Sequence, residues 1–170
     1  DMLKIALALS PDENAVSAFG IQCGVEYAVG TFSLNPIPGK EITDEAQPFS
    51  KQSLAAYKAA YEKSGYHLSV IESRPPMEKI KLAQDGRDEE IEVVCEFIRN
   101  MGAVGIPVWC SMWMPVHGVI RTSFGISSRG GAQVSGFHLE EFERNAEPHD
   151  YGEVTEEDQW ENLRYFLERT

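Results

Sequence analysis

Positive charge is scarce in this sequence of 170 residues. Lys and Arg supply 15 positive charges against 27 negative charges from Asp and Glu, so the formal net charge is −12 at pH 7. Because polyphosphates are bound mainly through Lys and Arg, this balance argues against nucleic acid and anionic membranes as partners. Long apolar runs are missing too, and no segment approaches the roughly 18 to 20 residues that a membrane-spanning helix needs.

Cysteine is rare and scattered. The three cysteines, Cys23, Cys95 and Cys110, are odd in number, lie far apart and form no CxxC pair. This pattern predicts reduced thiols rather than a disulfide framework or a structural zinc site. The N-terminal residues 1–4 also lack the apolar run of a signal peptide. We therefore expect a soluble, cytoplasmic protein.

Apolar segments alternate with amphipathic ones along the chain. The predicted strands cover residues 3–9, 25–29, 67–71 and 106–113. A helix signal follows each of them: the Ser-Pro pair at 10–11, Ser50, the acidic stretch from about Asp88, and the Thr-Glu-Glu-Asp sequence at 155–158. Such alternation predicts parallel strands that are joined by crossover helices.

Apolar side chains at helical spacing predict the buried faces of two of these helices. The predicted buried residues are Ile91, Val94, Cys95 and Ile98 in the helix that begins near Asp88, and Trp160, Leu163 and Leu167 in the last helix. Gly102 and Gly105 are expected to end the first of them.

Two α/β architectures fit this order of elements, an open doubly wound sheet and part of a parallel (β/α)8 TIM barrel. The turn after the first strand, Leu9–Asp12, contains no glycine, so a phosphate-binding loop is not indicated and the barrel is favoured. Periodicity disappears between residues 117 and 154, which predicts a long irregular insertion. We interpret residues 1–170 as a single domain that covers about the first four βα units.

Several short motifs resemble, in the same order, those of the mannonate dehydratase family. These motifs are Leu68–Pro76 (LSVIESRPP), Ile80–Leu82, Gly86–Asp88, Gly105–Val108, Met114–Val116, Arg121–Thr122 and Trp160–Leu163. Members of that family have a xylose isomerase-like TIM barrel and dehydrate D-mannonate to 2-keto-3-deoxy-D-gluconate in hexuronate catabolism. The resemblance therefore implies a lyase that acts on a small sugar acid.

The resemblance also implies a divalent Mn²⁺ or Fe²⁺ ion whose His, Cys and Asp ligands come after Thr170. The chain is then the N-terminal half of a barrel, contains no metal ligands and is inactive alone. A half-barrel leaves two unpaired strand edges. We therefore expect the remaining half as a partner, in a second fragment or chain, and we expect the protein to form a homo-oligomer.

Candidate substrate-binding residues follow the predicted strands, because active sites of parallel barrels gather at the carboxyl ends of the strands. Glu72 and Ser73 follow the third strand, and the alternative role of Glu72 is an ion pair with Arg74 or Lys79. Trp113 could form an apolar wall for sugar carbons or belong to the core. Arg121 matches a family arginine and could hold a carboxylate, or it could be a solvent-exposed loop residue.

His117 is the candidate catalytic residue, because a neutral imidazole near pH 7 can donate or accept a proton. The family usually has an aromatic residue at this position, and Met112 replaces a family asparagine. These departures point to a divergent subgroup that uses another sugar acid.

Two other functions remain open at this point. A sugar isomerase or epimerase could use the same type of barrel, since fold does not fix the reaction. A non-catalytic half-barrel that self-associates through its open edges would instead be a binding or structural module.

Overall fold

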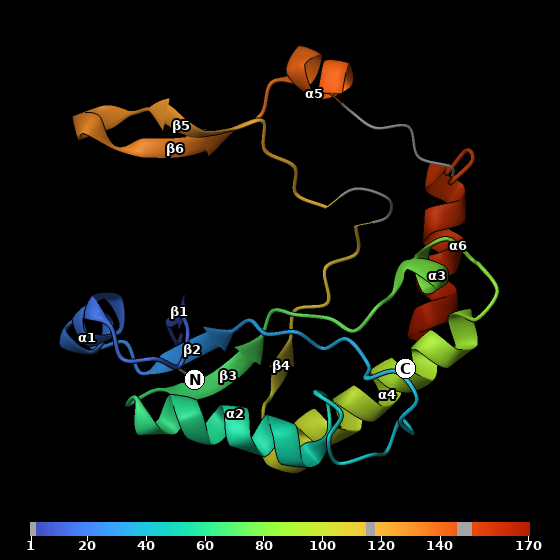
Figure 1. Ribbon diagram of the computed structural model, residues 1–170, viewed down its shortest axis with the longest axis horizontal. Helices are drawn as coiled ribbons and strands as arrows, with labels where there is room; N and C mark the ends of the chain where they lie inside the picture. Colours follow the sequence, from blue (N-terminus) through green and yellow to red (C-terminus); the bar gives the residue numbers. More distant parts are fainter. Residues whose placement is uncertain (1–2, 115–117, 146–150) are drawn as a thin grey trace.

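A parallel four-stranded sheet forms the centre of the protein. The computed structural model describes residues 3–114, 118–145 and 151–170. The sheet has the order β1-β2-β3-β4, and every neighbouring pair is parallel. Its strands are β1 (Ala6–Ala8), β2 (Tyr27–Gly30), β3 (His67–Ile71) and β4 (Val108–Trp109). Strands that neighbour in sequence thus neighbour in space, as in the first half of a (β/α)8 barrel (Figure 1).

Two long helices pack against each other beside this sheet. They are α2 (Lys51–Lys63) and α4 (Arg87–Val104), and α2 also packs on β3. The main core lies between these helices and β2 and β3, where Tyr61, Leu68, Ile71 and Phe97 are all buried. This part of the molecule has the layered arrangement that the sequence predicts.

The ends of α2 and α4 follow from their capping residues. The Ser50 hydroxyl accepts a hydrogen bond from the backbone N–H of Ser53, which confirms the predicted start of α2. The helix α4 begins at Arg87, one residue before the expected position, and ends at Gly105, whose φ of 73° is left-handed. Gly102 was expected to break this helix but lies inside it. The buried residues are Ile91, Val94, Phe97 and Met101, so the prediction that Ile98 belongs to the buried face is wrong.

The first βα unit differs from its prediction. The strand β1 has only three residues, and Leu3 and Ile5, which were expected within it, are exposed. The helix α1 (Ala15–Gln22) starts later than the Ser-Pro signal suggests, because Asn14 and Ser17 form the capping box. Both differences lie on the β1 side of the sheet. Here β1 is an edge strand, because within the described residues it pairs only with β2.

A second core joins the short helix α3 (Glu78–Lys81) to α4 and to α6 (Glu156–Leu167). The capping box of Thr155 and Asp158 confirms the predicted start of α6. Its predicted buried stripe is wrong at two of three positions, because Trp160 is 64% exposed and Leu167 is also exposed, whereas Leu163 packs against the second core as predicted. Asn162 and Phe166 face the core instead.

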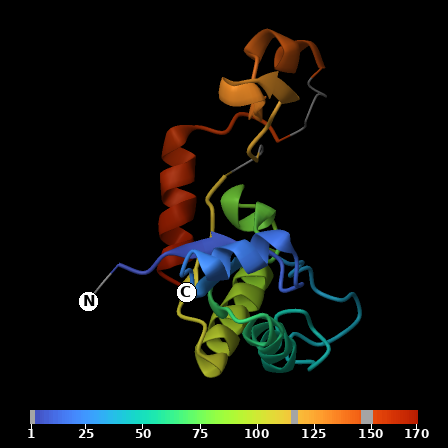
Figure 2. The same ribbon diagram turned by 90° about the vertical axis from the view of Figure 1, so that its left-hand side faces the viewer.

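Residues 118–145 form what we call the arm. The segment contains a hairpin of β5 (Ser123–Ser127) and β6 (Gln133–Gly136), a 3-10 turn η1 (Arg129–Gly131) and the helix α5 (Leu139–Asn145). The prediction of an irregular insertion is therefore wrong for much of residues 117–154. Both ribbon views show the arm standing away from the sheet (Figures 1 and 2).

The last predicted strand is shorter than expected. Residues 106–113 were expected to be a strand, but β4 contains only Val108 and Trp109, and Met112 has a left-handed φ of 43°. All three cysteines are free thiols, and Cys23 is exposed. Among the described residues, none of the helices combines the length and the apolar character that crossing a membrane requires.

Candidate functional site

The carboxyl ends of β2, β3 and β4 meet at one edge of the sheet (Figure 1). Hydrogen bonding continues just beyond the strands. The backbone N–H of Glu72 donates to the Gly30 carbonyl at 2.9 Å, and that of Cys110 donates to the Ile71 carbonyl at 2.9 Å. The residues that follow the strands are therefore fixed by backbone bonds, which suits a site that must hold a ligand in one orientation.

Ser73 links the loops that follow these strands. Its hydroxyl accepts a hydrogen bond from the backbone N–H of Phe32 at 2.9 Å, and its carbonyl accepts one from the indole N–H of Trp109 at 2.8 Å. The Phe32 ring stacks on Tyr57 with 4.0 Å between ring centroids. Ser73 thus has a clear structural role, and its predicted role in substrate binding stays a prediction.

Glu72 is the acidic residue at this edge. It is half-buried and follows β3 directly. The alternative role, an ion pair with Arg74, is not what the structure has, because the Arg74 guanidinium lies 3.8 Å from the Glu78 carboxylate. Within the described residues no ion pair involves Glu72. Its predicted role in substrate binding stays a prediction.

Trp113 lies close to α6. Its indole N–H donates to the side-chain carbonyl of Gln159 at 3.1 Å, and its ring lies 5.9 Å from the Phe166 ring. The side chain is half-buried against the second core. These contacts favour the core alternative for Trp113, and its predicted role in substrate binding stays a prediction.

Of the two remaining candidates, Arg121 is not brought together with Glu72 and Ser73. Arg121 is exposed on the arm, where its Nε donates to the Ser135 hydroxyl at 3.2 Å. The arm stands away from the sheet edge (Figure 2). His117 lies outside the described residues. Their predicted roles therefore stay predictions.

A buried lysine is the feature that the sequence reasoning missed. Lys81 is 1% exposed, and its ammonium donates to the Met114 carbonyl at 3.3 Å and lies 3.5 Å from the Glu78 carboxylate. A fully buried lysine is rare unless it is paired. The only sequence signal was its place inside the motif Ile80–Leu82, and burial cannot be read from that.

The backbone of Lys81 is held as firmly as its side chain. Its carbonyl accepts hydrogen bonds from the side-chain amides of Gln159 at 2.9 Å and Asn162 at 2.8 Å. Lys81 therefore connects three elements: α3, the segment after β4 that contains Met114, and α6. This connection fixes the chain next to Trp113.

Electrostatic effects around Lys81 oppose each other. Burial, and then the Arg74 guanidinium, lower the pKa of Lys81, while Glu78 acts to raise it. Burial acts to raise the pKa of Glu78, but the Met77 N–H, Lys81 and Arg74 outweigh it, so the Glu78 pKa is lowered. Glu90 also acts to raise the pKa of Lys81, so the two cations Arg74 and Lys81 lie with two carboxylates, Glu78 and Glu90.

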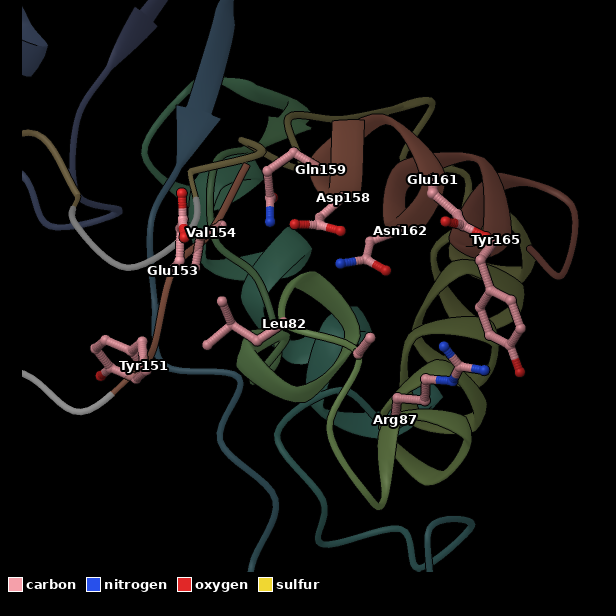
Figure 3. Close-up of a pocket in the computed structure, with 11 residues that line it drawn as sticks. Leu82, Arg87, Tyr151, Glu153, Val154, Asp158, Gln159, Glu161, Asn162 and Tyr165 are labelled. Carbon is pink, nitrogen blue, oxygen red and sulfur yellow. The ribbon is translucent and has the colours of Figure 1, made fainter. Parts of the chain in front are cut away.

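A surface pocket of about 470 Å³ lies between the α3–α4 connection and α6 (Figure 3). Its charged lining residues are Arg87, Glu153, Asp158 and Glu161. Asp158 already caps α6, and hydrogen bonds from Thr155 lower its pKa. Because three carboxylates face one guanidinium, the pocket is a poor place for an anionic sugar acid. The carboxyl ends of β2, β3 and β4 remain the better candidate for the substrate site.

The described residues do not fit a divalent metal ion. Across residues 3–114, 118–145 and 151–170, no three His, Cys, Asp or Glu side chains gather as a metal site requires. Glu72 is a single carboxylate at the sheet edge.

Comparisons with known proteins point to one family. The sequence model of the family described as "D-mannonate dehydratase (UxuA)" matches residues 11–149. A mannonate dehydratase of Enterococcus faecalis is 31% identical over 86% of this chain and 47% of its own length. One from Oceanobacillus iheyensis is 30% identical over 70% of this chain and 40% of its own length. The chain thus spans about half the length of these relatives.

A solved structure agrees with the fold. The crystal structure of a mannonate dehydratase from Streptococcus suis serotype 2 matches with a TM-score of 0.78 at 24% sequence identity. The match covers 99% of this chain and 49% of the other chain. The fold prediction, a partial parallel TIM barrel, is therefore confirmed.

Proposed function

This chain belongs to the D-mannonate dehydratase family, and we propose that it supplies half of the barrel of an enzyme that dehydrates D-mannonate, or a related sugar acid, to 2-keto-3-deoxy-D-gluconate. The observation that carries this proposal is the family match over residues 11–149. We propose that this reaction belongs to hexuronate catabolism. We also propose that the enzyme is cytoplasmic, as expected from the sequence.

The proposed reaction removes one molecule of water. A base takes the proton from C2, the hydroxyl at C3 leaves with a proton from an acid, and the resulting enol becomes the 2-keto product. On this chain, we propose that Glu72 contacts a substrate hydroxyl. Its position directly after β3, and the lack of an ion-pair partner for it among the described residues, support this role.

The metal and its ligands belong to the remaining half in this proposal. The family resemblance implies Mn²⁺ or Fe²⁺, and the described residues hold no ligand cluster. The chain also spans only 40% and 47% of two relatives. We propose that the second half of the barrel brings the metal ligands to the same end of the sheet as Glu72.

The open edges of the sheet support such a second half. Within the described residues, β1 pairs only with β2, and β4 pairs only with β3. Apolar side chains are exposed at both edges, among them Ile5 before β1 and Val108 on β4. Closing the barrel would pair both edges and cover these side chains.

The test is an assay of the complete protein that contains residues 1–170. It is purified, supplied with Mn²⁺ or Fe²⁺ and incubated with D-mannonate, and 2-keto-3-deoxy acid is detected with thiobarbiturate. Product formation, with none from the 170-residue chain alone, is the expected result. Interconversion of an aldose and a ketose without keto-deoxy product would favour the isomerase alternative. A stable assembly without either activity would favour a binding module.

A further inference from the structure

Lys81 is joined to two consecutive residues of the segment that follows β4. Its ammonium donates directly to the Met114 carbonyl at 3.3 Å. Its own carbonyl accepts from the Gln159 amide at 2.9 Å, and the same Gln159 side chain accepts from the Trp113 indole N–H at 3.1 Å. Figure 3 shows the Gln159 side chain extending from α6 toward Leu82, the residue after Lys81. One buried lysine thus holds Met114 directly and Trp113 through Gln159.

The other end of this segment is fixed as well. The backbone N–H of Cys110, directly after β4, donates to the Ile71 carbonyl at 2.9 Å. Residues 111–114 therefore run between two fixed points, the backbone bond at the end of β3 and the buried Lys81. Because active sites of parallel barrels gather at the carboxyl ends of the strands, this segment lies where substrate contacts are expected.

Met112, between these two points, has a backbone conformation that residues other than glycine rarely adopt. Its φ is 43°, and within residues 3–114, 118–145 and 151–170 the only other non-glycine residue with a positive φ is Ala83. Such conformations are unfavourable, persist only where the surrounding structure over-determines them, and cluster at functional sites. Met112 directly precedes Trp113, and Ala83 comes two residues after Lys81. Both therefore adjoin the hydrogen bonds of Lys81, which constrain the segment that contains Met112.

A buried ammonium is a costly way to hold a segment that only has to be stable. Removing an ammonium from water is unfavourable, whereas apolar side chains are buried without that cost. What the ammonium of Lys81 adds is direction, because a charge-assisted hydrogen bond fixes the Met114 carbonyl in one place. This points to a role in the geometry of the segment and not in stability alone.

We propose that Lys81 is a positioning residue for the reaction: through Met114 and Gln159 it holds residues 111–114 in the conformation that contacts the sugar acid. The inference rests on the proposed function and deepens it, because Lys81 is buried and acts without touching the substrate. Misplacement of an active-site group by about 1 Å can lower a rate about 10²-fold. Loss of the ammonium should therefore affect kcat more than KM.

Steady-state kinetics with D-mannonate test this role in the complete protein supplied with Mn²⁺. We expect Lys81→Met to lower kcat about 10- to 100-fold and to change KM by less than about threefold. The matched control is Ser50→Ala, which removes a buried helix cap on α2 outside this network and should lose stability but keep kcat. Circular dichroism at the assay temperature verifies that both variants are folded. An unchanged kcat in Lys81→Met, or equal losses of kcat in both variants, would overturn the proposal.

Hydrogen–deuterium exchange gives a second readout that does not depend on the reaction. The backbone amides of residues 110–114 should exchange about tenfold faster, or more, in Lys81→Met than in the wild type and in Ser50→Ala. Gln159→Leu removes the link to Trp113 but keeps the ammonium, so it should raise exchange in the same segment and lower kcat by smaller factors.

The exchange data also separate this inference from the proposed function. Unchanged exchange of residues 110–114 in Lys81→Met would overturn the inference, whatever the kinetics show. If the wild type does not dehydrate D-mannonate, the proposed function fails, and exchange alone then decides whether Lys81 holds the segment. If Lys81→Met does not fold, Gln159→Leu decides by the same two criteria.

Discussion

The centre of the sheet and its margins have similar patterns of apolar residues, but their apolar side chains are buried to very different degrees. In the centre, which comprises β2, β3, α2 and α4, the apolar side chains that the pattern predicts are mostly buried. At the margins, which comprise β1, α1 and the arm, apolar side chains of similar size are exposed. Periodicity thus indicates which face of a helix or strand can be buried. Whether that face is buried depends on a packing partner, which the described residues supply for the centre and for the second core of α3, α4 and α6, but not for the margins.

Truncation of a phenylalanine at each place should give the largest contrast in stability. Phe97 on α4 is fully buried and meets Trp109 edge-on with 5.6 Å between ring centroids. We expect Phe97→Ala to lower the free energy of unfolding by about 3–5 kcal/mol because it leaves a cavity. Phe19 on α1 is 66% exposed, and Phe19→Ala should change stability by less than about 0.5 kcal/mol.

Urea unfolding of both variants of the complete protein measures this contrast. If Phe19→Ala were as destabilising as Phe97→Ala, α1 would be covered by the remaining half of the barrel. That outcome would mean that α1 belongs to the buried centre in the complete protein.

Catalysis should depend on the strand ends of the centre rather than on exposed helix surface. Under the proposed function, Glu72→Gln keeps the size of the side chain but removes its charge. We expect it to lower kcat/KM for D-mannonate about 10²-fold, within the range of a group that takes part in proton transfer or transition-state binding. The matched control is Glu92→Gln on the exposed side of α4, which should leave kcat/KM unchanged. Equal values for wild type and Glu72→Gln would remove Glu72 from the site.

The buried lysine is expected to have a moderate effect on stability. Lys81→Met keeps the length of the side chain but removes the hydrogen bond to the Met114 carbonyl and the partner of Glu78. Loss of a buried, charge-assisted bond should lower the free energy of unfolding by about 1–3 kcal/mol. Lys79→Met, at an exposed position two residues away, should have little effect. Similar losses in both variants would mean that the burial of Lys81 has no special role.

The wild type and Lys81→Met should also differ in how their stability responds to alkaline pH. Because burial and Arg74 lower the pKa of Lys81, the unfolded chain binds more protons than the folded chain between the lowered pKa and the ordinary lysine value. Stability therefore rises with pH across this window. We expect the stability difference between wild type and Lys81→Met to grow in favour of the wild type as pH increases there. A constant difference from pH 7 upward would show that the folded pKa is not lowered.

Removal of helix caps should give the smallest effects and the most direct comparison of the two regions. Ser50 at α2 is buried, and its hydroxyl also donates to the Glu45 carbonyl at 2.7 Å. Asn14 at α1 is exposed and caps through Val16 and Ser17. We expect losses of about 1–2 kcal/mol for Ser50→Ala and about 0.5–1 kcal/mol for Asn14→Ala in thermal unfolding. The reverse order would contradict the division into centre and margin.

Local signals predicted several elements of the fold well. The bounds of β3 match residues 67–71, and Ser50 and Thr155 cap α2 and α6 as expected. These features depend on neighbouring residues only. The Ser-Pro signal at residues 10–11 failed because Asn14 and Ser17 form a competing capping box a few residues later. The periodic pattern also failed to predict the bounds of β4 and the hairpin in the arm, because their strands are too short to show a clear repeat.

The candidate site was predictable only in part. The position of Glu72 and Ser73 after β3 follows from the rule that sites gather at the carboxyl ends of parallel strands. The bonds of Ser73 to Phe32 and Trp109 join residues that lie far apart in the chain. The burial of Lys81 depends on Met114 and on α6, and no local pattern contains that information.

The sequence by itself determined the alternation of strands and helices, the parallel half-barrel and the family, because each of these depends on residue types and spacings within short segments. Only the tertiary structure decided which apolar faces are covered, that Lys81 is buried beneath the strand ends, and that Arg121 lies on a separate arm. The physical reason is that burial and ion pairing are set by contacts between distant segments. An amphipathic pattern indicates that a face can be buried, but the partner that buries it is encoded elsewhere in the chain or in another chain.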